Sequence, residues 1–213
     1  MHKELPDDIF FIQYDSQLSE PHIEIALENF GYHIGTQYYH WICNTANIDV
    51  KILDVSKKFD IRPASIDNAK EIKTLTEKFP EPGRFVADPF FKKEGKVLYS
   101  TWAYNYCLNL SSSKQVLACW INDRIVGYHT IKFISDKVAN LSILRIDPKY
   151  ANKLIGFSLV AESIKYCMER GIESIYTRTS KFNKQINIIN RNLGYSIIES
   201  GIQFHWVNKC RQL

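Results

Sequence analysis

The strongest chemical signal in the sequence is a corner between an extended segment and a helix, at residues 146–156. An apolar run ends at Ile146, an Asp-Pro pair follows, and apolar residues recur at helical spacing from Ile155 onward. The first amides of such a helix lack partners within the helix, and the helix dipole is positive at this end. Amides in this arrangement bind pyrophosphate. A plain strand-to-helix connection without a ligand explains the pattern equally well.

The corner resembles the motif of the GNAT superfamily of N-acetyltransferases, V-x-P-x-x-[RQ]-G-x-G-[IVL]-[GA], which lies between a strand and a helix. Ile146, Pro148, Ile155 and Gly156 are in register with it. In that family the loop amides hold the pyrophosphate of acetyl-CoA. The resemblance therefore implies acetyl-CoA as co-substrate and a binding site made by Leu144, Ile146, Ala151, Asn152, Lys153, Leu154, Ile155 and Gly156.

Three positions of this loop depart from the motif. Ala151 stands where the family has Arg or Gln, and Asn152 and Leu154 stand where it often has glycine. Glycine adopts positive φ without strain and lets a backbone approach a phosphate closely. Asn tolerates the left-handed conformation better than Leu does. Leu154 is therefore the harder substitution for cofactor binding.

A second segment, NKQINIINRNLGY, resembles the family signature N-x-x-A-x-x-x-Y-x-x-x-G-[FY] at Asn183, Gly194 and Tyr195. The resemblance implies that Asn183 hydrogen-bonds the cofactor. Asn190 replaces the Tyr that commonly protonates the CoA thiolate, and an amide does not supply a proton as a phenol does. Three alternatives stay open: Tyr195 or Tyr176 takes this role, water does, or the protein is not a transferase. Asn190 and Tyr195 are the candidate catalytic residues.

Residues 83–107 resemble a narrower group, the TDP-fucosamine acetyltransferase type, through the arrangement R-F-x-x-D-P-x-F…L-Y-x-x-W. That group acetylates the 4-amino group of a nucleotide-linked deoxyhexose. The resemblance implies that Arg84 pairs with the diphosphate, and that Phe85, Tyr99 and Trp102 stack on the sugar or base. The other interpretation is structural, because aromatic residues at helical spacing commonly belong to a core.

No residue stands out as the base that takes the proton from the amine. Asp147 is typical of a turn, and Asp88 and Glu94 qualify only by their position in the substrate segment. His129 and His205 fall on predicted strands, and we expect both to be satisfied within the sheet.

The elements that position these residues are predicted from apolar periodicity and turn residues. In chain order they are a strand and a helix at 59–79, a helix ending near 107, a hairpin of strands at 115–120 and 125–134, a strand from 139, a helix closed by Gly171, a strand at 174–179, a helix from 183, and a closing hairpin of strands at 196–198 and 203–208. The expected fold class is α/β (α+β), a GNAT fold. It has a mixed, mostly antiparallel twisted sheet, helices on both faces, and a splayed strand pair at the cofactor cleft.

The chain is expected to divide into the acetyltransferase domain at 58–213 and a partial α/β segment at 1–57. In this segment we predict a strand at 9–15, a helix at 22–30 ended by Gly31, a strand at 33–43, and a connector at 45–57. Such a segment is too short to hold a core of its own. A substrate lid and an interface are both open roles for it.

Composition limits the class of protein. With 213 residues, 45% of them hydrophobic, the chain can bury one substantial core. The net charge of +4 is too small and too dispersed to indicate nucleic acid. Five cysteines without C-x-x-C spacing suit reduced core thiols better than disulfides or a metal site. No apolar run is long enough for a membrane span and no signal peptide is evident, so we expect a cytoplasmic protein.

Together these observations predict an acyl-CoA-dependent N-acetyltransferase. Its acceptor is a small-molecule primary amine, and the narrower resemblance implies the amino group of a nucleotide sugar. Two alternatives remain. One is a catalytically silent binding module of the same fold, to which Leu154 and Asn190 point. The other is an acyltransferase for a peptide or aminoacyl amine. The closing strands also offer an edge for pairing between subunits in a homodimer.

Overall fold

The computed structural model describes residues 11–17, 21–78, 91, 94–150 and 154–207, and they form one eight-stranded sheet in the order β1-β8-β2-β7-β6-β5-β4-β3. The strands are β1 (Phe11–Gln17), β2 (His33–Asn44), β3 (Asp60–Pro63), β4 (Lys114–Ile121), β5 (Arg124–Phe133), β6 (Val138–Ile146), β7 (Ser174–Ser180) and β8 (Ser196–Val207). Neighbouring strands are antiparallel except β6 and β7, which are parallel. The predicted mixed, mostly antiparallel sheet is confirmed.

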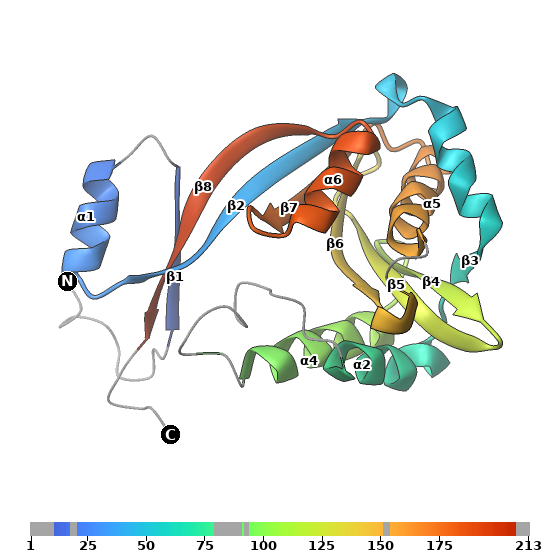
Figure 1. Cartoon of the computed structure of the whole chain (residues 1–213), viewed down its shortest axis with the longest axis horizontal. Coiled ribbons are helices and arrows are strands. Elements are labelled where there is room, and N and C mark those ends of the chain that lie inside the picture. The colour runs from blue at the N-terminus through green and yellow to red at the C-terminus, as the bar shows by residue number, and fades with distance from the viewer. Residues whose placement is uncertain (1–10, 18–20, 79–90, 92–93, 151–153, 208–213) are drawn as a thin grey trace.

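Helices cover both faces of this sheet (Figure 1). On one face lie α5 (Ile155–Glu169) and α6 (Lys184–Asn192), and on the other lie α2 (Ala69–Lys78) and α4 (Glu94–Leu108). The long strands β2 and β8 run from this body to α1 (Pro21–Asn29) and β1 at the far end of the molecule.

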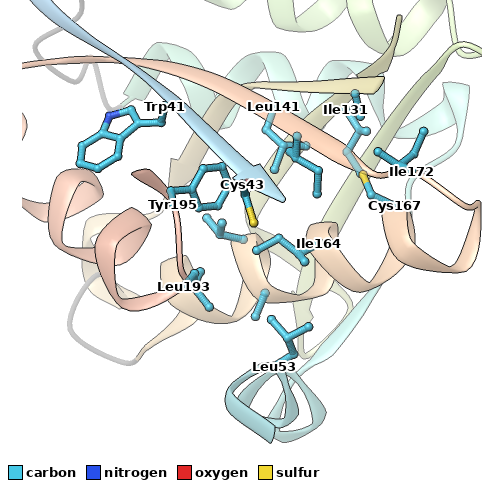
Figure 2. Packing of buried hydrophobic residues seen from close by; sticks show 14 of the residues in the cluster. Trp41, Cys43, Leu53, Ile131, Leu141, Ile164, Cys167, Ile172, Leu193 and Tyr195 are labelled. Carbon is cyan, nitrogen blue, oxygen red and sulfur yellow. The ribbon is translucent and has the colours of Figure 1, made fainter. Parts of the chain in front are cut away.

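The main core lies between the sheet and α5 (Figure 2). Leu159, Val160 and Ile164 of α5 are buried, as their helical spacing predicts. Opposite them, Trp41 of β2 and Leu141 of β6 are almost fully buried. Burying each such side chain contributes roughly 1.5–3 kcal/mol. The N-terminal strand β2 therefore shares the core of the rest of the chain.

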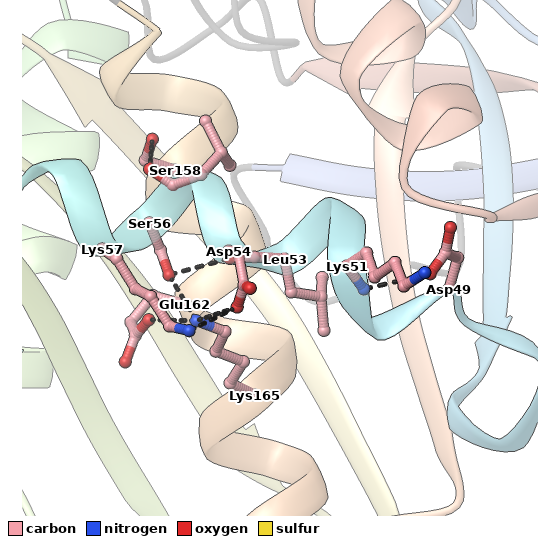
Figure 3. A network of polar contacts seen from close by, with 10 residues as sticks. Asp49, Lys51, Leu53, Asp54, Ser56, Lys57, Ser158, Glu162 and Lys165 are labelled. Carbon is pink, nitrogen blue, oxygen red and sulfur yellow. Dashed lines mark hydrogen bonds and ion pairs between the residues drawn. The ribbon is translucent and has the colours of Figure 1, made fainter.

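The predicted connector at 45–57 forms two short 3-10 helices, η2 (Thr45–Asn47) and η3 (Val50–Lys58). Polar contacts hold η3 against α5 (Figure 3). Lys165 Nζ lies 2.8 Å from Ser56 Oγ and 3.9 Å from Asp54 Oδ1, while Leu53 is buried beneath. The connector thus covers the outer side of α5.

Local sequence signals account for several element boundaries. Asn122 and Asp123 adopt φ of 50° and 57°, which closes the two-residue hairpin between β4 and β5. Before α2, and preceded by η4 (Ile66–Asn68), Ser65 N donates a hydrogen bond to Asn68 Oδ1 at 2.9 Å. Gly31 follows α1 with a φ of +82°, a conformation that ends helices.

The predicted closing hairpin is wrong, because β8 is one continuous strand over Ser196–Val207. Gly201 lies within it, opposite Tyr38 of β2 and Gln17 of β1. A Cβ at Gly201 would lie 2.4 Å from the Ser16 carbonyl oxygen, so glycine marks a close approach of β1 here and not a turn. One edge of β8 pairs with β1 and the other edge pairs with β2. The strand that was expected to pair between the subunits of a homodimer therefore has no open edge along most of its length.

The N-terminal strands are inserted into the sheet, with β2 between β7 and β8 and β1 at the edge. The division of the chain at residue 57 stays a prediction, and the sheet continues across it. The four cysteines that the structure describes, Cys43, Cys107, Cys119 and Cys167, are buried and have free thiols. Among the described helices, none combines the length and apolar character needed to cross a bilayer.

Candidate functional site

The parallel strands β6 and β7 separate part-way along their length. Their pairing runs from Val138 opposite Ser174 to Leu141 opposite Thr177 and no further. Beyond these residues β6 still pairs with β5, and β7 still pairs with β2, so the facing edges of β6 and β7 border a gap. The predicted splayed strand pair is confirmed. Unpaired edges of this kind can pair with an extended ligand that carries amides.

A cleft of about 780 Å³ passes through this gap, a size typical of small-molecule sites. It reaches both faces of the sheet. Its lining comes from β2, α4, β5, β6, α5, β7 and α6, from Tyr195 just before β8, and from Gln203 of β8. Residues from nearly the whole length of the chain thus meet here.

On the side of α5 and α6 the cleft has a mostly apolar floor, which we define by Val160, Ile186, Ile189, Asn190, Tyr195 and His129. Asn190 Nδ2 and Tyr195 Oη are buried there and have no hydrogen-bond partner in the part of the chain that the structure describes. An unsatisfied buried polar group costs about 1–3 kcal/mol. Two of them in one cleft indicate a place for polar atoms of a ligand.

The environments of Tyr195 and His129 keep both side chains uncharged. Burial, and secondarily the nearby Cys43 and Cys167, raise the pKa of Tyr195 well above its usual value. Burial lowers the pKa of His129 to about 4, although a backbone contact with Leu159 opposes this shift. The floor therefore holds polar groups without charge at neutral pH.

The tautomer of His129 follows from its hydrogen bonds. Its Nδ1 lies 2.9 Å from Ser163 Oγ, and the Ser163 hydroxyl donates its own proton to the Leu159 carbonyl at 2.7 Å. The ring proton therefore sits on Nδ1 and is donated to Ser163. One nitrogen of His129 is satisfied as predicted, but the side chain also lines the cleft.

On the opposite side, the cleft borders a polar network that we call the rim: Asp15, Tyr38, His40, Arg178 and Glu199. The Tyr38 hydroxyl donates to Glu199 Oε1 at 2.7 Å, and His40 Nδ1 lies 3.9 Å from Glu199 Oε2. Arg178 places its guanidinium 4.1 Å from the Tyr38 ring centroid and donates to Asp15 Oδ2 at 2.7 Å. The rim carries charges that are paired with one another.

Helix α4 contributes an aromatic platform to the same cleft. The rings of Tyr99 and Trp102 lie 6.2 Å apart at an interplanar angle of 24°. Arg145 Cζ lies 5.3 Å from the Tyr99 ring centroid. Both aromatic side chains line the cleft, and Trp102 is 40% exposed. The interpretation that this pair belongs to a core is therefore wrong for Trp102.

Comparison with known proteins identifies the family. A model of the acetyltransferase (GNAT) family matches residues 74–195, which is more than half of the 213 residues. The chain belongs to this family. GNAT members are N-acetyltransferases, and acetyl-CoA is the donor that the family uses. No curated protein matches the sequence.

Solved structures share the fold at low identity. A protein of unknown function from Staphylococcus epidermidis is 14% identical with a TM-score of 0.66, and the match covers 93% of this chain and 73% of that one. The PaiA N-acetyltransferase from Thermoplasma acidophilum, in complex with coenzyme A, is 18% identical with a TM-score of 0.56, over 70% and 99% of the two chains. A glucosamine N-acetyltransferase region of a fungal multi-domain β-N-acetylglucosaminidase is 14% identical with a TM-score of 0.62, over 95% and 24%.

Three of the residues that the GNAT motifs imply for the cofactor line the cleft. Leu144, Ile146 and Asn183 line it, and Asn183 also caps α6 by accepting a hydrogen bond from Ile186 N at 3.3 Å. Gly156 packs against the strand, since a Cβ there would lie 2.7 Å from Ile146 Cδ1. Ile155 beside it is buried in the core. The remaining loop residues Ala151, Asn152 and Lys153, and the substrate residues Arg84 and Phe85, lie outside the described residues.

Leu154 adopts a left-handed backbone conformation, which glycine takes without strain. Its φ is 61°, which is strained for a Leu. Its side chain is 56% exposed and does not line the cleft. The Leu154 side chain therefore does not fill the cleft.

The rim was not predicted from the sequence. Tyr38 and His40 reach the cleft because β2 inserts beside β7, and Glu199 follows because β8 is a single strand along β2. The only local signal was the aromatic, alternating pattern of residues 33–43, which predicts a strand but not its neighbours.

Proposed function

We propose that this GNAT enzyme transfers the acetyl group of acetyl-CoA to a small primary amine in the cleft between β6 and β7. The observation that carries the proposal is the pair of buried, unpartnered donors on the floor, Asn190 Nδ2 and Tyr195 Oη. Both belong to the segment in which the GNAT signature places contacts to the thioester end of the coenzyme. A polar ligand atom at this position satisfies groups that the protein itself leaves unsatisfied.

The splayed edges provide for the pantetheine arm. The edge of β6 beyond Leu141 and the edge of β7 beyond Thr177 face the gap, where the amides of an extended arm can pair as a strand does. The pyrophosphate then lies at the N-terminus of α5, which starts at Ile155 beside the C-terminal end of β6. The 15 residues of α5 give this terminus a full helix dipole.

In the proposed reaction the neutral amine attacks the thioester carbonyl carbon. An amide at the gap edge of β6 near Ile146 stabilises the oxyanion. The thiolate then leaves toward Asn190 and Tyr195. Because its pKa is raised, Tyr195 acts as a hydrogen-bond donor to sulfur and not as an acid. Solvent protonates the thiolate, which costs little because the thiol pKa is about 8.5.

For the acceptor, we propose an amine on a nucleotide-linked deoxy-amino sugar. Tyr99 and Trp102 offer a flat aromatic surface on the acceptor side, which suits a sugar face or a base. Arg145 and Lys132 also line the cleft and supply positive charge for a diphosphate. Peptide and aminoacyl amines, and binding without turnover, are alternatives that the experiment distinguishes.

The first experiment measures thermal unfolding with and without acetyl-CoA. At about 100 times its dissociation constant, a ligand adds about 2.7 kcal/mol of stability, which raises the Tm of a chain of this size by roughly 5–11 °C. Ile189→Trp fills the floor and should abolish the shift. Ile188→Trp is the matched control, because Ile188 is the exposed neighbour on α6. Equal shifts in both variants, or none in the natural protein, contradict the proposed site.

The second experiment follows thiol release over nucleotide-linked amino sugars, free amino sugars, polyamines, peptides and aminoacyl amines. The proposal expects the nucleotide-linked amino sugars to be the fastest acceptors. Faster turnover of a peptide or aminoacyl amine overturns the proposed acceptor and leaves the transferase. Binding of acetyl-CoA with no thiol release on any amine identifies a silent module.

A further inference from the structure

His40 occupies a central place on the cleft side of the sheet. It lies directly opposite Arg178 in the pairing of β2 with β7, and directly opposite Glu199 in the pairing of β2 with β8. Because side chains alternate along a strand, His40 shares this face with Tyr38, while Trp41 points to the core on the other face. His40 lines the cleft and its side chain is 29% exposed. A ligand in the cleft can therefore reach it.

The carboxylate next to His40 is held in place. A Cβ at Gly201 would lie 2.6 Å from the Tyr38 hydroxyl, so the Tyr38 side chain can lie over Gly201 only because this residue has no side chain. From this position the hydroxyl donates a hydrogen bond to Glu199 Oε1. The other oxygen, Oε2, then lies on the side of His40 Nδ1, at 3.9 Å. This is longer than a hydrogen bond, but such contacts often tighten when substrate binds. A carboxylate at Nδ1 leaves Nε2 as the nitrogen available to the cleft.

Several charged or titratable groups face His40. Glu199 on β8 and Arg178 on β7 lie directly opposite it in the two strand pairings. Tyr176, also on β7, has its ring centroid 5.7 Å from that of His40. The cleft lining adds Tyr99 on α4, Lys132 on β5 and Arg145 on β6. Arg178 is itself paired with Asp15, so part of its charge is balanced.

Other groups near the cleft are less suited to accept a proton. Asp15 accepts hydrogen bonds at both oxygens, from Arg178 and from Gln203. His129 donates through Nδ1 to Ser163 and is buried in the floor. Asp147 accepts a hydrogen bond from Lys149 N and forms the turn, as predicted. Of the remaining candidates from the sequence, Asp88 lies outside the described residues, and for Glu94 the structure describes only the backbone, at the start of α4.

We propose that His40 is the catalytic base that takes the proton from the acceptor amine, and that Glu199 and Tyr38 are its positioning residues. This inference rests on the proposed acetyl transfer and assigns the step that the GNAT motifs leave open. It also gives the N-terminal strand β2 a direct part in the reaction.

The step balances as follows. The amine nitrogen forms a bond to the thioester carbonyl carbon, and the carbonyl electron pair moves to oxygen. One proton passes from the nitrogen to His40 Nε2. The electron pair returns, the carbon–sulfur bond breaks, and CoA leaves as the thiolate. His40 gives its proton to solvent and solvent protonates the thiolate, so the products are the N-acetyl amine and CoA.

The test uses the full chain and the fastest amine of the acceptor panel. Loss of a general base typically costs 10²–10⁴-fold, so we expect His40→Gln to lower kcat/KM by about 100-fold or more at neutral pH. The acidic limb of the rate–pH profile, which reports protonation of the base, should disappear. Added imidazole should restore part of the activity to His40→Ala, which a merely structural defect does not allow.

Glu199→Gln and Tyr38→Phe should each lower kcat by about 10-fold and keep the acidic limb, because His40 is still present. His22→Gln, on the exposed face of α1, is the matched control and should leave the profile unchanged. Calorimetric titration with acetyl-CoA separates the two proposals. If His40→Gln binds acetyl-CoA normally and keeps the rate and pH profile of the natural protein, the assignment of His40 is overturned and the transferase stands. If the natural protein does not bind acetyl-CoA, both are overturned.

Discussion

The floor and the rim of the cleft differ in burial, in charge and in whether their polar groups have partners. The floor is buried and uncharged, and it leaves two donors, Asn190 Nδ2 and Tyr195 Oη, without partners. The rim is partly exposed and charged, and its carboxylates at Asp15 and Glu199 are each held by at least one hydrogen bond. Unpartnered buried donors lower the free energy of unfolding of the ligand-free protein, and a bound ligand can pair with them. A network whose groups are already paired carries no such cost.

This difference assigns different steps of the proposed reaction to the floor and to the rim. Neutral donors in a buried floor suit a thioester sulfur, whose charge develops only as the bond breaks. Paired charges near water suit the movement of a proton from an amine. The two halves also come from different parts of the chain. The floor is built by residues 129–195, which include both GNAT signatures, whereas the rim is built by β1, β2 and β8 from the two ends of the chain together with Arg178 of β7.

The largest expected effect is the pH dependence that the floor imposes through His129. Its pKa is about 4 in the folded protein and about 6.5 in the unfolded chain, so the unfolded state binds more protons between these values. The free energy of unfolding should fall by up to about 3 kcal/mol as the pH drops from 7 toward 4. Denaturant unfolding of the natural protein and of His129→Gln at pH 7 and pH 4.5 checks this, because the variant should lack this part of the slope. An identical slope in both would show that the floor tolerates charge, as the rim does.

The next effect separates stability from activity. Tyr195→Phe and Asn190→Leu each remove an unpartnered buried group, so each should stabilise the free protein by about 1 kcal/mol, or roughly 2–4 °C in Tm. The same changes remove donors to the thiolate and should lower kcat by about 100-fold, as loss of a transition-state hydrogen bond does elsewhere. Thermal scans and thiol-release assays on the same samples measure both.

In the rim, Glu199→Gln is the counterpart of these floor variants. It weakens a paired network and should lower stability as well as kcat. If floor and rim variants shift stability in the same direction, the contrast between the two halves does not hold.

A smaller effect is expected at the aromatic platform. Trp102→Ala removes one stacking surface and should raise the acceptor KM by about 2- to 13-fold, since such contacts are worth roughly 0.5–1.5 kcal/mol. The dissociation constant for acetyl-CoA should not change, because the floor is untouched. Val97→Ala is the matched control, as Val97 is exposed on the same helix away from the cleft. An altered acetyl-CoA affinity in Trp102→Ala would place the platform on the donor side.

The smallest effect is expected at the entrance to the floor. Leu154→Gly relieves a left-handed Leu, worth about 1–2 kcal/mol, and adds the chain entropy of glycine, worth about 0.5–1 kcal/mol. The net gain should be about 0.5 kcal/mol in denaturant unfolding, with acetyl-CoA affinity maintained or improved. Ile25→Gly, exposed within α1, has no such strain and should lose about 0.5 kcal/mol instead.

Much of the fold and part of the site were predictable from local patterns. The period change at residues 146–156 predicted a strand that leads through a loop into a helix, where the structure has β6 and α5. The second signature predicted site residues at Asn183, Asn190 and Tyr195, and these side chains line the cleft. These predictions succeeded because periodicity and motif spacing belong to contiguous residues. The sequence did not predict that Tyr195 Oη and Asn190 Nδ2 are buried without hydrogen-bond partners. Whether a buried polar atom finds a partner depends on which groups the other segments of the chain bring near it.

What the sequence by itself determined is therefore the order and type of most elements from residue 59 to the start of β8, and through them the family. Only the tertiary structure decided that β2 enters between β7 and β8, that β8 continues through Gly201, and that His40 consequently lies between Arg178 and Glu199. The physical reason is sequence separation. The contact of Trp41 Nε1 with Thr179 Oγ1, at 2.7 Å, joins residues 138 positions apart. Strand propensity in either segment indicates that the segment pairs with another strand. Only the packing of the whole core selects which strand becomes its neighbour.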